Sequence, residues 1–102
     1  MSGDHVALLI ALLGDRAARA DERDDAASYL GMTDDERALV ALVEVGSRTD
    51  DDEYIVAAAG RGLADAAIRR HIFDARWLTQ LRPAALDELI PWVKADAPDL
   101  FE

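Results

Sequence analysis

The 102-residue chain has no cysteine, a single lysine and only six aromatic residues. The absence of cysteine excludes disulfide bridges, a thiol nucleophile and thiolate metal sites. The longest apolar run, residues 6–13, has eight residues, whereas a membrane-spanning helix needs about 20. The run follows Asp4 and no lysine or arginine, so it does not have the form of a secretory leader. We therefore expect a cytoplasmic protein that does not insert into a membrane.

Signals for β-strands are also scarce. No segment combines alternating polarity with β-branched or aromatic residues, and threonine occurs only three times. Apolar residues instead recur at helical spacing, separated by short links marked by Gly or Asp. These patterns predict an all-α protein with about seven helices, which forms a single domain over residues 1–102.

Basic residues are outnumbered by acidic ones, 11 to 21, which gives a net charge of −10. A 51% apolar fraction is nevertheless typical of a folded chain. Because an acidic surface repels phosphate backbones, we expect no nucleic acid partner. The preference for Asp, Arg and Ala is typical of codon usage in a GC-rich bacterial genome, and adaptation to high salt is the alternative explanation.

Helix starts and stops can be placed from capping residues. Asp4 predicts the start of a first helix that ends at Gly14, and Asp21 predicts a second that ends at Gly31. Thr33-Asp34-Asp35-Glu36 has the pattern of a capping box, in which Thr33 and Glu36 bond each other's backbone amides. We expect a third helix to begin there and to occupy the centre of the fold.

The second half of the chain contains stronger helix breakers. Residues 50–53 are all acidic and predict another helix start. Gly60 and Gly62 predict a break before a further helix over residues 63–72, and Pro91 predicts a kink or restart in the last helix. The expected hairpins cover residues 21–47, 50–72 and 74–96. The predicted core is Leu39, Leu42, Val43, Ile55, Ala59, Leu63, Ala67, Ile68, Leu78, Leu86 and Leu89.

An internal repeat of about 30 residues is visible when Gly31 is aligned with Gly60, and Gly14 with Gly46. Residues 21–46 begin with Asp21-Glu22-Arg23, continue through Ala26-Ala27 to Leu30-Gly31, and end in a second apolar helix. This pattern resembles the short bacterial HEAT-like repeats of the phycobilisome-lyase type. The resemblance implies a short right-handed stack of antiparallel helix hairpins, a HEAT-like α-solenoid. An irregular bundle of six to seven helices is the alternative.

Residues suited to catalysis or metal binding are few. His5 and His71 are the only histidines and are far apart in sequence, so they form no ligand or triad pattern. The consecutive aspartates lack the alternating spacing of a calcium loop. We therefore predict no catalytic residue, metal or cofactor. Trp77 and Trp92 are expected to close the hydrophobic end of the stack, or else to serve as interaction anchors.

The acidic helix starts provide the candidate binding surface. We predict that they line one edge of the stack as an acidic ridge, because helix capping needs only one or two carboxylates per helix. Its residues are Asp34, Asp35, Glu36, Asp50, Asp51, Asp52 and Glu53, with Tyr54 as an aromatic anchor.

These features predict a non-enzymatic protein-binding module for a basic partner protein. Its small size and acidity resemble those of immunity proteins that neutralise basic nuclease toxins, and an adaptor is equally compatible. Two alternatives remain: a structural subunit that forms homo-oligomers through an apolar patch, and a lyase-like accessory protein. The lyase-like reading is disfavoured because the chain has no cysteine to hold a bilin.

Overall fold

The computed structural model describes residues 4–101, in which all regular elements are helices and no strand occurs. The all-α prediction is therefore confirmed. The elements are α1 (His5–Gly14), α2 (Ala20–Gly31), α3 (Glu36–Gly46), α4 (Glu53–Arg70), α5 (Trp77–Gln80), α6 (Pro83–Asp96) and the 3-10 helix η1 (Pro98–Phe101).

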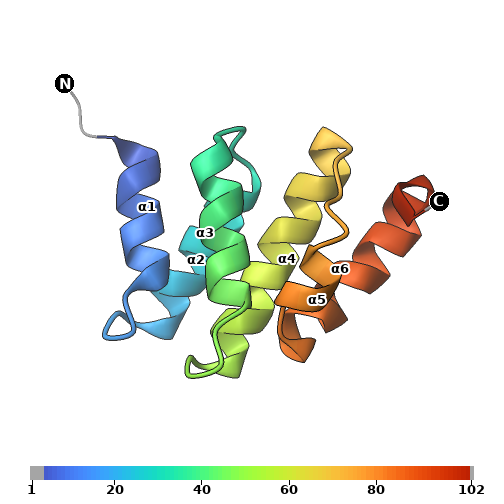
Figure 1. Ribbon diagram of the computed structural model, residues 1–102. Helices are drawn as coiled ribbons and strands as arrows, with labels where there is room; N and C mark the ends of the chain where they lie inside the picture. Colours follow the sequence, from blue (N-terminus) through green and yellow to red (C-terminus); the bar gives the residue numbers. More distant parts are fainter. Residues whose placement is uncertain (1–3, 102) are drawn as a thin grey trace.

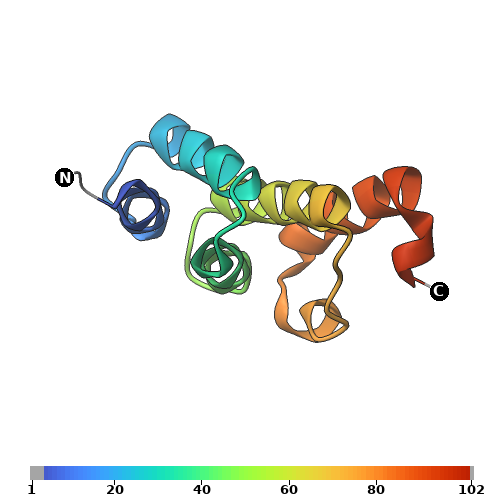
Figure 2. The ribbon, with the colours of Figure 1, turned by 90° about the horizontal axis from the view of Figure 1, so that it is seen from above.

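The helices form two layers. Seen from above, α2, α4 and α6 lie in one row, and α1, α3 and α5 lie in a second row beside it (Figure 2). Consecutive helices run in opposite directions, so the chain zigzags along the molecule from one end to the other (Figure 1). The result is a slab with extents of 41 × 32 × 20 Å. Among the helices of residues 4–101, none has both the length and the apolar character needed to cross a membrane.

Several helix ends lie where capping residues predict them. Asp4 precedes α1, and its carboxylate accepts a hydrogen bond from the Ala7 amide. Gly14, Gly31 and Gly46 are the last residues of α1, α2 and α3. These three ends therefore match the prediction, although none of the three glycines has the left-handed conformation of a glycine cap.

Two predicted caps are wrong. The α3 helix begins at Glu36 rather than after Thr33, and its cap is Asp35, whose carboxylate accepts from the Arg37 amide. This bond takes the place of the Thr33–Glu36 capping box. The α2 helix begins at Ala20, so Asp21 lies in its first turn rather than at its cap.

The predicted break at Gly60 and Gly62 is also wrong, because α4 continues through both glycines for 18 residues. Residues 50–72 are therefore a single long helix preceded by a loop, not a hairpin. Likewise, α6 runs through Pro91 without restarting.

Close packing of helices explains why these glycines are tolerated in α4. A Cβ atom on Gly62 would lie 2.6 Å from the carbonyl oxygen of Ala27 in α2. One on Gly60 would overlap the backbone of Ala85 in α6, and one on Gly31 would meet the backbone of Gly62. The cost of glycine within a helix, about 1 kcal/mol each, is thus offset by backbone contact with the two neighbours.

The core centres on α4, which packs against α2, α3 and α6. The predicted central position of α3 is therefore wrong. Among the predicted core residues, Leu78 is also wrong, since it is 42% exposed on the short α5. Six predicted core residues are buried, and four others are partly buried against them. The six are Leu42, Ile55, Ala59, Leu63, Ala67 and Leu89; the four are Leu39, Val43, Ile68 and Leu86.

We predict that Gly62→Ala destabilises the protein, although the same change in an open helix stabilises by about 1 kcal/mol. The added methyl group would force α2 away from α4, at a cost of about 1 to 3 kcal/mol. The measurement is urea unfolding followed by circular dichroism. Gly14→Ala is the control, because its methyl would meet only the flexible side-chain end of Arg48, at 3.4 Å. Equal stability of the two variants would contradict the close-contact explanation.

Candidate functional site

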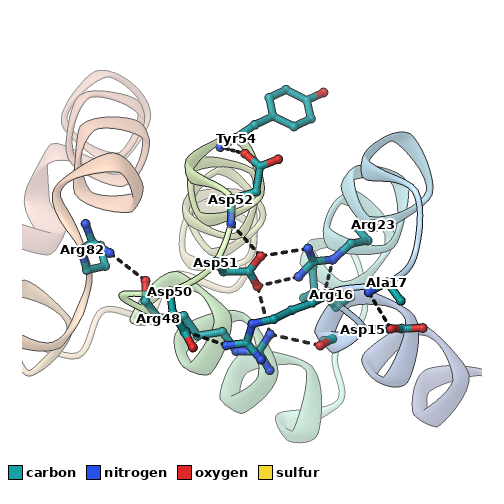
Figure 3. Close-up of polar contacts among 12 residues, drawn as sticks. Asp15, Arg16, Ala17, Arg23, Arg48, Asp50, Asp51, Asp52, Tyr54 and Arg82 are labelled. Carbon is teal, nitrogen blue, oxygen red and sulfur yellow. Dashed lines mark hydrogen bonds and ion pairs between the residues drawn. The ribbon is translucent and has the colours of Figure 1, made fainter.

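One end of the slab contains a buried ion pair between Arg23 and Asp51 (Figure 3). The two Arg23 terminal nitrogens donate to the two Asp51 oxygens at 2.9 and 2.6 Å. Both side chains are almost completely buried, and that of Asp51 is 2% exposed. This fork-to-fork geometry is the strongest form of an arginine–carboxylate contact.

The pair joins the ends of four helices. Arg23 Nε also donates to the carbonyl oxygen of Leu13, near the end of α1. Arg48, which follows α3, donates both to Asp51 and to the carbonyl oxygen of Gly14. The Asp52 amide donates to Asp51 as α4 begins. The network thereby satisfies carbonyl groups that helix ends leave without partners.

The charges in this network stabilise the ionised form of Asp51, as expected of a contact that holds the structure together. The Arg23 guanidinium holds the pKa of Asp51 well below its usual range, helped by the Asp52 amide and by Arg48, while burial opposes the shift. Asp51 is therefore a carboxylate at all physiological pH values. Since it is inaccessible, it is not available to a partner on an acidic ridge.

The predicted ridge is wrong in its geometry. Because α3 and α4 are antiparallel, the start of α3 lies beside the end of α4, not beside its start (Figure 1). Accordingly Asp34 pairs with Arg69, and Glu36 with Arg70, both in the last turn of α4. Residues 34–36 and 50–53 thus lie at opposite ends of the helices.

The assumption that surplus carboxylates have no structural task is also wrong. Asp50 pairs with Arg16 at 2.7 Å, and Asp35 with Arg37 at 2.6 Å. Asp52 caps α4 by accepting from the Tyr54 amide, and Glu53 lies 4.0 Å from Arg82. Each predicted ridge carboxylate therefore has an intramolecular partner.

Every arginine of the chain forms an ion pair with a carboxylate within residues 4–101. The net negative charge consequently resides in carboxylates that no arginine reaches. Most of those without an ion-pair partner in the described part of the chain belong to the layer of α2, α4 and α6. They are Glu22, Asp24, Asp25, Asp65, Asp87 and Asp96.

A groove of about 340 Å³ crosses this layer. Met32 and Trp92 are its large apolar side chains, and they are 56% and 51% exposed. The carboxylates of Asp65 and Asp96 also line it. The groove is lined by Ser28 of α2 and by Met32, which directly follows α2. The other lining residues are Arg61, Gly62, Ala64, Asp65 and Ile68 of α4, and Trp92 and Asp96 of α6. We call this feature the α4 groove.

A second groove, of about 370 Å³, lies beside α3 and α5 on the other layer. Leu39, Val43 and Trp77 contribute apolar surface to it. Its two carboxylates, Glu36 and Asp74, are both paired with arginines. This groove therefore has no surplus charge to attract a partner, in contrast to the α4 groove.

The aromatic candidates have different environments. Trp77 is buried and meets Phe73 edge to face, with ring centroids 5.2 Å apart, so it belongs to the core. Trp92 is exposed in the α4 groove. Tyr54 is half exposed, and its hydroxyl donates to Asp24 at 2.6 Å, which links α4 to α2. Both tryptophans were expected to close the hydrophobic core, but only Trp77 does so.

The two histidines remain far apart. His5 is exposed at the start of α1, whereas His71 caps the end of α4 in a left-handed conformation, with φ of 55°. His71 Nε2 lies 2.9 Å from an Asp99 carboxylate oxygen in η1. Within residues 4–101, no three His, Asp or Glu side chains are grouped so that they could hold a metal ion.

Comparisons with protein-family models, curated proteins and solved structures found no significant match to this chain. The α4 groove was not predicted from the sequence, because its residues come from three helices far apart in the chain. In the sequence, Arg23 is distinguished only as part of the repeat motif. Its buried partner Asp51 lies 28 residues further along, a separation similar to the repeat length.

We predict that Asp51→Asn destabilises the protein by about 3 kcal/mol or more at neutral pH, because it leaves the Arg23 charge buried without its counterion. The folded-state pKa of Asp51 is lowered, so its contribution is complete above the unfolded value of about 3.9 and is lost as the pH falls below it. The difference between wild type and variant should therefore narrow below about pH 4. Urea unfolding across pH measures this.

The exposed neighbour Asp50 provides the control for this pH experiment. Asp50→Asn breaks a surface pair with Arg16 and should cost less than about 1 kcal/mol. A similar loss in both variants, or a difference from wild type that persists unchanged at low pH, would show that the buried pair does not stabilise the fold.

Proposed function

We propose that the chain is a non-enzymatic protein-binding module, of adaptor or immunity type, that binds a basic partner protein through its layer of α2, α4 and α6. The observation that carries this proposal is the distribution of unpaired charge. Arginines neutralise the acidic helix ends, whereas carboxylates without an ion-pair partner in residues 4–101 gather on this layer. Such a field accelerates encounter with a basic surface.

We also propose that the architecture is a short HEAT-like stack. Arg48 donates to the carbonyl oxygen of Gly14, and Arg82 donates to that of Arg48, each across 34 residues. Arg16 and Asp50 pair across the same separation. Recurrence of one contact at a fixed interval supports a repeat, and stacked repeats present extended surfaces that bind other molecules. Fold resemblance alone is a weaker argument for function than the charge distribution.

The proposal keeps part of the binding surface expected from the sequence. Tyr54 remains a candidate contact, since it is half exposed and linked to the unpaired carboxylate of Asp24. Asp34, Asp35, Glu36, Asp50 and Asp51 are omitted because arginines already neutralise them. The proposed acidic surface thus shifts from residues 34–36 and 50–53 to the carboxylates of α2, α4 and α6 that no arginine reaches.

Two charge-matched variants test the proposal. Asp65→Asn/Asp96→Asn removes two carboxylates of the α4 groove, and Asp15→Asn/Glu44→Gln removes two exposed carboxylates that lie outside the layer of α2, α4 and α6. Both raise the net charge by the same amount. We expect basic proteins captured from the source cells to associate about tenfold more slowly with the first variant at low salt, and at an almost unchanged rate with the second.

Stopped-flow or surface-plasmon measurements at several salt concentrations provide these rates. Equal rates for the two variants would show that only total charge matters and that this layer is not the binding surface. Capture of no basic protein would contradict the proposed partner class.

Self-association is a second candidate, favoured by the composition of α1. This helix has no Asp, Glu, Lys or Arg, and Leu8 on its outer side is 65% exposed. A second copy could cover this surface without burying a charged side chain of the helix. Sedimentation velocity distinguishes the cases: self-association through α1 requires a wild-type dimer that Leu8→Glu converts to a monomer, and a monomeric wild type would exclude it.

A further inference from the structure

The α4 groove lies where three helices of one layer meet, and Gly62 and Ala64 of α4 are among its lining residues. A Cβ atom on Gly62 would meet Ala27 of α2 and Leu42 of α3, so this glycine faces the packed interior and not the groove. The exposed side chains around the groove come from α2, α4 and α6, and they offer a surface that crosses three helices.

The dimensions of the layer fit a helix. Neighbouring packed helices are about 8 to 10 Å apart, so α2 and α6 are separated by about 16 to 20 Å on either side of α4. A helix with its side chains is about 10 to 12 Å wide. An additional helix that lies on the outer surface of α4 can therefore reach α2 and α6 with its own side chains.

The side chains around the groove suit an apolar helix face. Met32 and Trp92 stand on opposite sides of α4, and the half-buried Ile68 lies between them. Exposed methionine adapts its shape to a bound surface, and tryptophan is enriched among residues that dominate binding energy. Amphipathic helices bind such grooves through residues spaced three and four apart.

The carboxylates that line the groove favour a positively charged ligand. Asp65 and Asp96 line it without ion-pair partners in the described residues, and Arg61 is already 3.8 Å from Glu88. A helix with lysines or arginines beside its apolar face would pair with these carboxylates. On the basis of the proposed function, we propose that the α4 groove binds a basic amphipathic helix of the partner protein.

A second copy of this chain does not fit the same description. Its most apolar helix, α1, has no lysine or arginine, and Asp4 and Asp15 flank it. Placing α1 in the groove would bring these aspartates towards Asp65 and Asp96. Like-charge contacts of this kind disfavour the arrangement.

Trp92 provides a direct test, because the only other tryptophan, Trp77, is buried. In Trp77→Phe protein, fluorescence would report Trp92 alone. The probe is an 18-residue helical peptide of leucine and lysine without tryptophan, with leucines on one face. We expect its binding to shift Trp92 emission to the blue. A scrambled peptide of equal charge should bind at least about tenfold more weakly.

Calorimetry on the unmodified chain, and on Trp92→Ala and Tyr29→Ala, provides a second readout that does not depend on Trp77→Phe. Trp92→Ala should weaken binding of the amphipathic peptide by about tenfold or more. Tyr29→Ala is the matched control, since Tyr29 is 58% exposed on α2 but does not line the groove. It should change binding less than about twofold.

The outcomes separate the two proposals. Equal binding of both lysine peptides, without a shift in Trp92 emission, would overturn the helix-in-groove inference while leaving a basic partner possible. Absence of binding by either peptide would overturn the inference and count against the basic partner class. Equal binding of an analogue with glutamate in place of lysine would show that the groove selects apolar surface alone. Dimerisation of the free chain that Trp92→Ala abolishes would identify a second copy as the occupant.

Discussion

Backbone contact between α4 and its two neighbours is the constraint on which the rest of the structure depends. Gly62 meets Ala27 and Gly31 of α2, and Gly60 meets Ala85 of α6. These small residues bring three helices into one row, with the buried side chains of α4 directed towards α2, α3 and α6. The same contacts hold α4 against both neighbours as one uninterrupted helix. The α4 groove lies on this three-helix layer, so the packing that stabilises the core also places the candidate binding surface.

Charge is divided between two tasks. At the helix ends, arginines pair with carboxylates, and the buried Arg23–Asp51 pair joins four chain segments. An exposed pair contributes little, but the loss of one partner from a buried pair leaves an uncompensated charge. The acidic excess remains on α2, α4 and α6, where the described residues offer it no ion-pair partner. The overall charge of −10 is thus unevenly distributed. Arginines neutralise most carboxylates at the helix ends, and most of the unpaired carboxylates lie in α2, α4 and α6.

The predicted arrangement of the acidic residues is wrong because a carboxylate that pairs with an arginine has the same local sequence pattern as one that stays unpaired. Residues 34–36 and 50–53 are the densest acidic clusters, yet each is engaged by arginines or helix caps at opposite ends of the molecule. Asp65 and Asp96 are isolated in sequence, and no local pattern marks them. Their proximity follows from the packing of α6 beside α4. The contrast between Trp77 and Trp92 has the same cause.

The sequence by itself determined the helical class and indicated the helix ends at Gly14, Gly31 and Gly46, because apolar periodicity and helix-stop residues act within a few residues. It identified only part of the core: Leu42, Ile55 and Leu63 were predicted, whereas buried residues such as Leu13 and Leu30 were not. Only tertiary structure decided that Gly60 and Gly62 lie inside a helix, because the compensating contacts come from Ala85 and Ala27. It likewise decided which carboxylates remain unpaired, since arginine partners lie as far as 35 residues away. Interactions between distant segments become local only after the chain has folded.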